Sequence, residues 1–363
     1  MSLACGIVGL PNVGKTTLFN ALTASGAETA SYAFSTVEPN LAVIEVPDGR
    51  LELIHGFIET DRIVPASVRV VDIAGLAKGA SSGEGMGNKF LGAIKETDAI
   101  LHVVQCFERG DVARETPVDP QADMDVLELE LAMADLETVT RNVERVAKKA
   151  RAGDKESIFQ RDVFTRAREL LEEGVQLRTQ EWSAAEHAAL RPLFLLTTKP
   201  VLYVANVGDG DTAGEGEHAR AVGEHAAAMG CDWLPLCCDI ECELMGMEDE
   251  DRDLFQEELG VRELGLPRLV AATYRLLGLQ TFFTAGPKEI KAWTIRRGDR
   301  APVAAGVIHS DFEKGFIRAE CYSVDDLVEH GSEAAIKAAG KLRVEGRDYV
   351  MREGDVVHFL VGK

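Results

Sequence analysis

A single run of eight residues near the start of the chain constrains its fold more than any other feature. Residues 9–16 read GLPNVGKT and fit the pattern GxxxxGK[ST] of a phosphate-binding loop. The apolar run from Ala4 to Leu10 before it is typical of a buried strand, and Thr17 to Leu22 after it has apolar residues at helical spacing. A strand, a glycine-rich loop and a helix in this order predict a P-loop fold.

Each fixed residue of this loop has a chemical task. The glycines let backbone N–H groups turn inward around phosphates at the N-terminus of the following helix. Lys15 would place its charge on the β- and γ-phosphates, and Thr16 would offer its hydroxyl to Mg²⁺. Asn12 could hold a monovalent cation such as K⁺ beside the phosphates. We expect the nucleotide to be bound by these residues: Asn12, Val13, Gly14, Lys15, Thr16 and Thr17.

Further apolar runs predict the rest of the sheet. They occupy residues 68–73, 99–106, 200–206 and 233–238, and helical stretches alternate with them. Strands that alternate with helices indicate an α/β domain with a parallel sheet wrapped by helices.

A long insertion interrupts this alternation. From Leu129 to Ala150 apolar residues recur at alternating steps of three and four, which is the seam of a coiled coil. The break at 152–154 and a second helical stretch predict an antiparallel hairpin. We expect this hairpin to contact a protein or to set the geometry of the molecule.

The end of the chain has another pattern. Strand-like runs, a helix from Pro302 to His309 and two strands within 349–361 predict a compact α+β module. We therefore divide the chain into a P-loop domain in two parts (1–123 and 198–278), an inserted helical hairpin (124–197) and a C-terminal module (279–363).

Two further segments fit the moving parts of a nucleotide switch. Asp72 ends the second apolar run within DIAG and could hold Mg²⁺ through water, while the Gly75 amide could sense the γ-phosphate. The glycine-rich stretch 79–87 is typical of a switch segment. Thr36, within STVEPN, could close over the nucleotide and complete the metal shell. The candidate catalytic residues are therefore Lys15, Thr36 and Gly75, and the candidate metal ligands are Thr16, Thr36 and Asp72.

Two positions bear on the reaction and on the base. Ras-like switches place a glutamine after DxxG to orient the attacking water, but Leu76 stands here, so hydrolysis must use another group or be slow without a partner or ion. Guanine-specific proteins carry Asn-Lys-x-Asp after a later strand. Here Asn206, Val207 and Asp209 occupy that motif. The lysine that would stack on the base is absent, although Asp209 retains the carboxylate that guanine would require.

The composition of the chain indicates which cellular compartment and which classes of binding partner to expect. The formal charge of −21 argues against non-specific binding to nucleic acid. Residues 281–363 are neutral, with 13 basic and 13 acidic side chains, so this tail is the better candidate for any such contact. With neither a signal peptide nor an apolar run long enough to span a membrane, we expect a cytoplasmic protein without membrane contact. The seven cysteines match no zinc spacing and are expected to be reduced thiols.

Together, residues 9–16, 35–40, 72–76 and 206–209 resemble the motifs of the YchF, or Obg-like ATPase, family. The hairpin fits as well, and so does the stretch 308–319 (IHSDFEKGFIRA), which is similar to part of a TGS domain. The resemblance covers essentially the whole chain. It implies a Ras-like P-loop domain, a C-terminal β-grasp (TGS) domain, a preference for ATP over GTP, and association with the ribosome in translation or stress control.

The chain departs from this family at two places. The family usually has glutamate where Asp209 stands, which leaves GTP open as a ligand beside ATP. Some bacterial members have a histidine assigned to hydrolysis in the loop after the third strand, but residues 107–115 contain none. Arg114 stands nearest that place. It cannot act as a base at neutral pH, but it could stabilise charge on the γ-phosphate.

Our leading hypothesis is a monomeric, Mg²⁺-dependent ATP-hydrolysing switch that contacts the ribosome and its RNA through the TGS-like and helical domains. Basic side chains of the tail that could contact RNA are Lys288, Lys291, Arg296, Arg297, Arg300, Lys314 and Arg318. A GTPase switch on the same scaffold is the first alternative. A small-molecule kinase and a non-catalytic scaffold with a structural nucleotide are the others. A kinase would need a substrate lid rich in arginine and would have no use for a switch threonine such as Thr36. A single-turnover assay with and without ribosomes would distinguish a non-catalytic scaffold from an ATP hydrolase.

Overall fold

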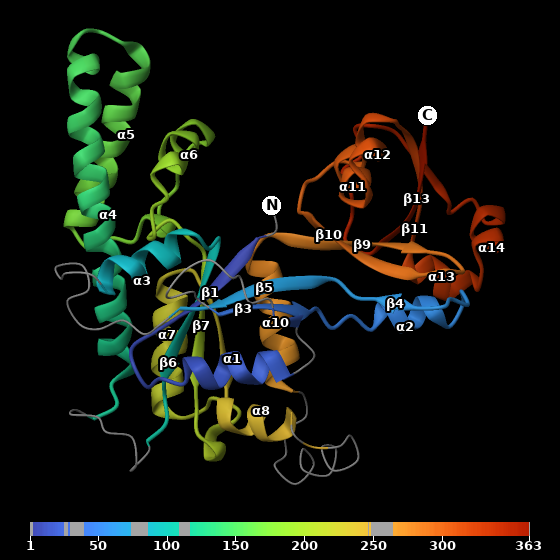
Figure 1. Cartoon of the computed structure of the whole chain (residues 1–363), viewed down its shortest axis with the longest axis horizontal. Coiled ribbons are helices and arrows are strands. Elements are labelled where there is room, and N and C mark those ends of the chain that lie inside the picture. Colours follow the sequence, from blue (N-terminus) through green and yellow to red (C-terminus); the bar gives the residue numbers. More distant parts are fainter. Residues whose placement is uncertain are drawn as a thin grey trace. The chain divides into compact units, whose positions relative to one another are not determined.

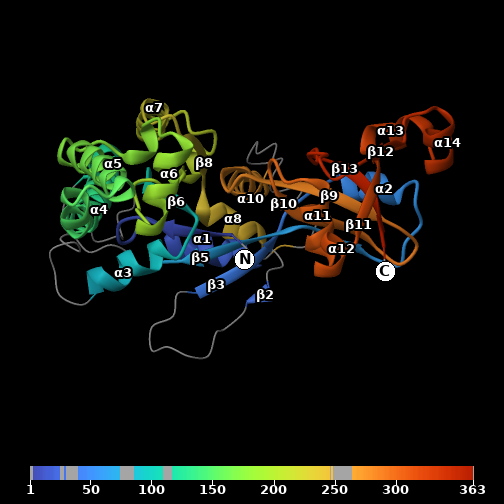
Figure 2. The same cartoon turned by 90° about the horizontal axis from the view of Figure 1, so that it is seen from above.

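The computed structural model describes residues 3–24, 28–29, 40–73, 86–108, 117–245, 247 and 264–362. Contacts divide the chain into two compact units, whose elements are labelled in Figure 1 and seen from above in Figure 2. The first unit consists of Met1–Val43 and Arg69–Leu269. The second consists of Ile44–Val68 and Val270–Lys363.

The first unit is built on a sheet that has seven strands in the described residues. Their order is β2 (Glu28–Thr29), β3 (Asn40–Glu45), β5 (Ser67–Asp72), β1 (Ala4–Val8), β6 (Ala99–Gln105), β7 (Val201–Asn206) and β8 (Asp232–Leu236). The strands from β5 to β8 are all parallel, which confirms the predicted parallel sheet. Their carboxyl ends therefore meet at one edge, and this edge is where ligands bind in open α/β sheets.

Helices cover this sheet and make its core. They are α1 (Lys15–Ala24), α3 (Met86–Lys95), α7 (Glu217–Ala228) and α8 (Cys238–Met245). A further helix, α10 (Gly265–Leu276), begins in the first unit and continues into the second. Strand residues such as Val8, Ile100 and Tyr203 are at most 1% exposed and share one apolar core with side chains of α3, α7 and α8. The core fixes the strands and hence the loops at their carboxyl ends.

The predicted helical hairpin is confirmed (Figure 1). It consists of α4 (Pro120–Arg151) and α5 (Lys155–Glu172), followed by η1 (Leu177–Thr179), α6 (Ala184–Leu190) and η2 (Arg191–Leu193). Val139 and Val146 are buried against α5 as the seam requires. Leu129 is 59% exposed, so its assignment to the seam was wrong. The first turns of α4 pack on the sheet through Leu127 and Leu131, and this turns Leu129 away from both the sheet and α5.

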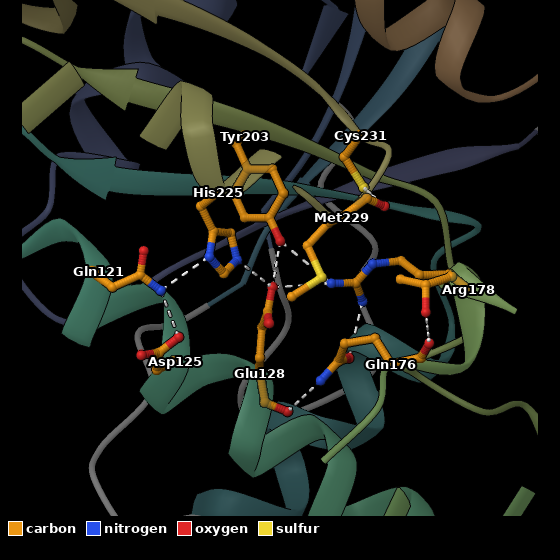
Figure 3. A network of polar contacts seen from close by, with 10 residues as sticks. Gln121, Asp125, Glu128, Gln176, Arg178, Tyr203, His225, Met229 and Cys231 are labelled. Carbon is orange, nitrogen blue, oxygen red and sulfur yellow. Dashed lines mark hydrogen bonds and ion pairs between the residues drawn. The ribbon is translucent and has the colours of Figure 1, made fainter. Parts of the chain in front are cut away.

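A buried carboxylate fastens the hairpin to the sheet (Figure 3). Glu128, on α4, accepts a hydrogen bond from the Tyr203 hydroxyl of β7. Arg178 Nη2, from η1, and His225 Nε2, from α7, each lie 3.1 Å from the same Glu128 oxygen. Gln176 adds a bond from its side-chain amide to the Glu128 carbonyl. We call Glu128, Tyr203, Arg178 and His225 the joint, because they link both ends of the hairpin to the sheet.

The second unit contains another sheet, six-stranded in the described residues. Its order is β12 (Arg343–Glu345), β11 (Phe316–Ser323), β13 (Asp355–Val361), β9 (Leu279–Ala285), β10 (Ile290–Arg296) and β4 (Ile63–Val64). Its helices are α2 (Arg50–His55), α11 (Ala301–Ile308), α12 (Ser310–Lys314), α13 (Val324–His330) and α14 (Glu333–Ala338). Phe282, Ala305 and Cys321 lie in a core between the sheet and α11. This is the predicted C-terminal α+β module.

Two details of the second unit differ from the sequence-based expectation. Residues 44–68 and 270–278, which the sequence groups with the P-loop domain, belong here. The first segment does so because β4 pairs with β10 and because Arg50 bridges Asp48 and Glu353. The first of the two strands predicted within 349–361 is also wrong. Residues 349–351 bond instead to residues 299–301, through Ala301 N to Tyr349 O and Met351 N to Asp299 O, so only β13 is a strand.

Candidate functional site

The glycine-rich loop joins β1 to α1 and lies tightly against two neighbouring strands. Gly14 has a φ of +98°, and a Cβ built on it would lie 2.2 Å from Asn206 Nδ2. A Cβ on Gly9 would lie 2.5 Å from the Val103 carbonyl oxygen. Asn12, between them, also has a positive φ of 64°. Close approach and the left-handed turn thus require glycine at both ends of the run.

Lys15 is the charged centre of the loop. Its side chain is buried, with the whole residue 7% exposed, and Nζ donates a 2.6 Å hydrogen bond to the Leu10 carbonyl. Burial lowers the pKa of Lys15 to about 8, and the nearby Asp72 carboxylate offsets only part of that shift. A buried ammonium with so little compensation strongly favours an added anion, which is what a phosphate group supplies.

The other residues of the loop divide by exposure. Val13 is buried, whereas Asn12 and Thr16 are exposed. Thr17 is half-buried, and its carbonyl accepts a 3.3 Å contact from Cys242 Sγ on α8. Thr16 therefore keeps an accessible hydroxyl on the first turn of α1, next to the buried lysine.

Asp72 lies where the sequence predicts it, at the carboxyl end of β5 and in register with Ile7 of β1. Burial raises its pKa, while the charge of Lys15 and a side-chain hydrogen bond from Asn40 act in the opposite direction. The Asp72 carboxylate and the exposed Thr16 hydroxyl are hard oxygen donors of the kind that Mg²⁺ prefers.

Asn206 connects the predicted base motif to the phosphate loop. Its Nδ2 donates a 2.9 Å hydrogen bond to the Val13 carbonyl, and its Oδ1 accepts a 3.1 Å bond from the Cys238 amide. The side chain is 4% exposed. It thus holds three loops of the same sheet edge together, a role that the motif alone does not reveal.

The neighbours of Asn206 are placed differently from each other. Val207 is 2% exposed and packs in the core, so its side chain is turned away from any ligand. Asp209 is exposed, and its Oδ1 accepts a local hydrogen bond from the Gly210 amide. Phe107 lies beside this loop, since a Cβ on Gly208 would meet Phe107 Cβ at 3.7 Å. Nothing in the spacing of the sequence had singled out Phe107 as a neighbour of the base motif.

Several predicted residues lie outside the described residues. They are Thr36, Gly75, Leu76 and Arg114, together with most of the stretch 79–87.

Three expectations about other chemistry can be compared with the structure. All seven cysteines are free, as predicted. The described residues contain no group of three or more His, Cys, Asp or Glu side chains that could hold a metal ion. Among the helices that the structure describes, none is long and apolar enough to cross a membrane.

Comparisons with known proteins agree with this geometry. Residues 4–149 match a family model described as "50S ribosome-binding GTPase", and residues 279–362 match the YchF-GTPase C-terminal model, described as "Protein of unknown function (DUF933)". "Ribosome-binding ATPase YchF" of Bacillus subtilis is 45% identical over 362 residues, and that of Escherichia coli O157:H7 is 48% identical over 361. Each alignment covers 99% of both chains.

The chain belongs to the YchF family. Among solved structures, the Schizosaccharomyces pombe YchF GTPase matches with a TM-score of 0.88 and 34% identity, covering 99% of this chain and 98% of that one. The YchF resemblance stated from the sequence motifs is therefore confirmed, as is the P-loop nucleoside triphosphatase fold.

Proposed function

We propose that the chain is a Mg²⁺-dependent ATP hydrolase that works as a regulatory switch, associates with the ribosome in the cytoplasm, and acts in translation or stress regulation. One observation carries the nucleotide part of this proposal. The buried Lys15, with its lowered pKa, lies in a left-handed glycine loop that Asn206 ties to the base motif. The names of the relatives support hydrolysis and ribosome association.

The residues of the site have separable roles in this proposal. Lys15 binds and orients the β- and γ-phosphates and neutralises charge that develops between them. The N-terminus of α1 adds backbone N–H groups to the same phosphates. Thr16 and Asp72, with Thr36 of the switch segment, would hold Mg²⁺, which would supply positive charge to the phosphate groups. Gly75 senses the γ-phosphate and Arg114 could stabilise its charge.

ATP is the proposed substrate because the base motif lacks a stacking cation. Val207 stands where guanine-specific proteins place lysine, and its side chain is buried in the core. The exposed carboxylate of Asp209 favours the alternative, GTP, because it could accept hydrogen bonds from guanine. A monovalent cation such as K⁺ beside Asn12 would supply positive charge next to the phosphates in place of an arginine finger.

Ribosome association would involve the second unit and the helical hairpin, with the protein acting as a monomer. Within the second unit, residues 281–363 carry the basic side chains named above and are neutral overall, whereas residues 1–280 are strongly acidic. RNA contact is therefore less opposed by repulsion there than on the sheet of the first unit.

The test is hydrolysis of ATP and of GTP at matched Mg²⁺, in K⁺ or Na⁺, with and without ribosomes. We expect kcat/KM for ATP to exceed that for GTP by about tenfold or more, a difference of at least ~1.4 kcal/mol, and ribosomes to raise kcat. Lys15→Ala should lose nucleotide binding and hydrolysis. A Lys15→Ala protein that hydrolyses ATP at the normal rate would place the activity elsewhere, and a tenfold preference for GTP would reverse the base assignment.

A further inference from the structure

The tip of the helical hairpin carries a dense group of positive charges. Residues 145–155 form the end of α4, the turn and the start of α5 (Figure 1). Five of them are exposed basic residues, which we call the tip cations: Arg145, Lys148, Lys149, Arg151 and Lys155. The same run contains one acid, Asp154. Even with the flanking Glu144 and Glu156 included, the tip has a net charge of +2 in a chain of −21.

The tip cations differ from the other basic residues of the hairpin in their partners. Arg141 pairs with Glu137 at 2.5 Å, and Arg161 pairs with Asp162 at 2.7 Å. Within the described part of the chain no ion pair includes a tip cation. The nearest acid, Asp154, is engaged in capping α5, where it accepts from the Ser157 amide at 2.9 Å and the Ser157 hydroxyl at 2.5 Å. Its electrostatic attraction to Lys149 leaves most of the positive charge uncompensated.

Helix stability explains only part of this pattern. Lys148, Lys149 and Arg151 lie in the last turn of α4, where positive charge is favourable to the helix dipole. Lys155 is the first residue of α5, where a positive charge opposes the dipole. Arg145 lies before the last turn. A partner outside the chain accounts for these two positions as well as for the other three.

The hairpin also carries these charges away from the acidic body. Ala134 is the last residue of α4 that belongs to the core of the sheet. At about 1.5 Å of rise per residue, Arg151 lies about 25 Å beyond Ala134 along the helix. The Debye length at physiological ionic strength is about 8 Å, so repulsion between the acidic body and a polyanion is largely screened at the tip.

The backbone of the tip is held by packing within the chain, and its surface is poor in apolar side chains. Val146, Ala150 and Ser157 are buried at its base, and Gly153 makes the turn with a φ of +87°. Phe159, 37% exposed, is the exposed large apolar side chain nearest the tip in the described residues. Protein–protein interfaces usually need an apolar centre, whereas contact with a phosphate backbone needs fixed cations.

We propose that the tip cations bind phosphate groups of ribosomal RNA, so that the hairpin is a docking arm. This inference rests on the ribosome association proposed above and names the part of the chain that provides it. The rest of the chain is acidic and repels RNA, so the contact is confined to the tip.

The test compares two double variants of the full chain in ribosome pelleting over a range of salt. The tip variant is Lys148→Gln with Lys155→Gln. The matched control is Arg141→Gln with Arg161→Gln, which removes the same charge from exposed but paired residues of the same hairpin. Loss of two phosphate contacts should lower the slope of log K against log[salt] by roughly 1.4 to 1.8. It should also weaken binding about tenfold at low salt, while the control changes binding less than about twofold.

Competitors distinguish RNA from an acidic protein surface. Poly(U) should displace the wild-type protein from ribosomes. It should be no more effective against the residual ribosome binding of the tip variant than against the binding of the wild type. Polyglutamate of equal charge should be a weak competitor. An unchanged salt slope in the tip variant, or stronger competition by polyglutamate, would overturn the inference while leaving ribosome association intact. Wild-type protein that does not pellet with ribosomes at any salt would overturn the association itself, and the docking arm with it. Nucleotide hydrolysis without ribosomes should be equal in all three proteins.

Discussion

The joint and the phosphate loop, both in the first unit, are buried charged sites that differ in how completely the protein compensates their charges. At the joint, burial alone would raise the pKa of Glu128, but hydrogen bonds from His225 and Tyr203 and the charge of Arg178 bring it below its usual range. At the phosphate loop, burial dominates. It lowers the pKa of Lys15 to about 8 and raises that of Asp72.

This difference separates a structural charge from a functional one. At the joint the chain itself compensates the carboxylate, since one oxygen of Glu128 receives three donors, and these contacts fix the hairpin on β7. The phosphate loop keeps charges that the chain itself satisfies poorly, at the edge where β7 ends in Asn206. A site such as the phosphate loop is stabilised most by a ligand whose charges are opposite to those that the chain leaves uncompensated. Substitutions at the two sites should therefore have opposite consequences for stability and for binding.

The largest effect on stability is expected from Glu128→Gln. The amide cannot replace a carboxylate toward Arg178, and removing one partner of a buried ion pair costs about 3–5 kcal/mol of unfolding free energy. Equilibrium urea unfolding measures this loss. Glu137→Gln is the control, because it breaks an exposed pair on the same helix and should leave the midpoint unchanged. Equal effects of the two variants would mean that the joint contributes nothing specific.

Much of the nucleotide edge could be predicted because its signals are local. The loop 9–16, Asp72 at a strand end and the heptads after Ala132 each lie within a few residues of sequence. The joint could not be predicted, because Glu128 meets Arg178, Tyr203 and His225 across 50 to 97 positions.

The place of residues 44–68 and the hydrogen bonds of Asn206 could not be predicted from the sequence for related reasons. The stretch 44–68 joins the second unit through a strand of two residues, β4, whose pairing depends on tertiary structure rather than on pattern. The motif at 206–209 correctly marks a loop at the nucleotide edge. It does not reveal that Asn206 binds the Val13 carbonyl and the Cys238 amide, because both partners are backbone groups and leave no trace in side-chain identity.

A smaller effect should follow from Tyr203→Phe, which removes one donor from Glu128 and keeps the other two. Hydrogen bonds to charged groups contribute about 1.5–3 kcal/mol, against about 0.5–1.5 for neutral partners. Tyr274→Phe is a matched control, since the Tyr274 hydroxyl is also buried but contacts only neutral oxygens of Gln280, Thr281 and Thr294. Urea unfolding should give the larger loss for Tyr203→Phe. The reverse order would show that Glu128 does not depend on this donor.

The first unit should also be sensitive to acid through His102, whose ring packs at a tilt against Tyr203 with ring centroids 5.3 Å apart. Burial lowers the pKa of His102 to about 3, far below the ordinary value near 6.5. The unfolded chain therefore binds a proton that the folded chain does not, and stability is lost as pH falls below 6.5. Between pH 7.5 and 5.5 this histidine should account for a loss of about 1.4 kcal/mol. His102→Phe should remove that part of the pH dependence. A variant with the same slope as wild type would exclude His102 as its source.

The smallest effect on stability is expected at the phosphate loop, from Lys15→Met. Methionine keeps most of the apolar stem and removes a buried ammonium that desolvation disfavours, at the loss of one hydrogen bond to Leu10. The two changes oppose each other, so the unfolding free energy should stay within about 1 kcal/mol of wild type or rise. ATP should at the same time stop shifting the unfolding midpoint, because ligand stabilisation disappears with binding. Urea unfolding with and without Mg-ATP measures both quantities on one sample. A loss of more than about 2 kcal/mol without ligand would make Lys15 a structural charge like Glu128 and remove the distinction between the two sites.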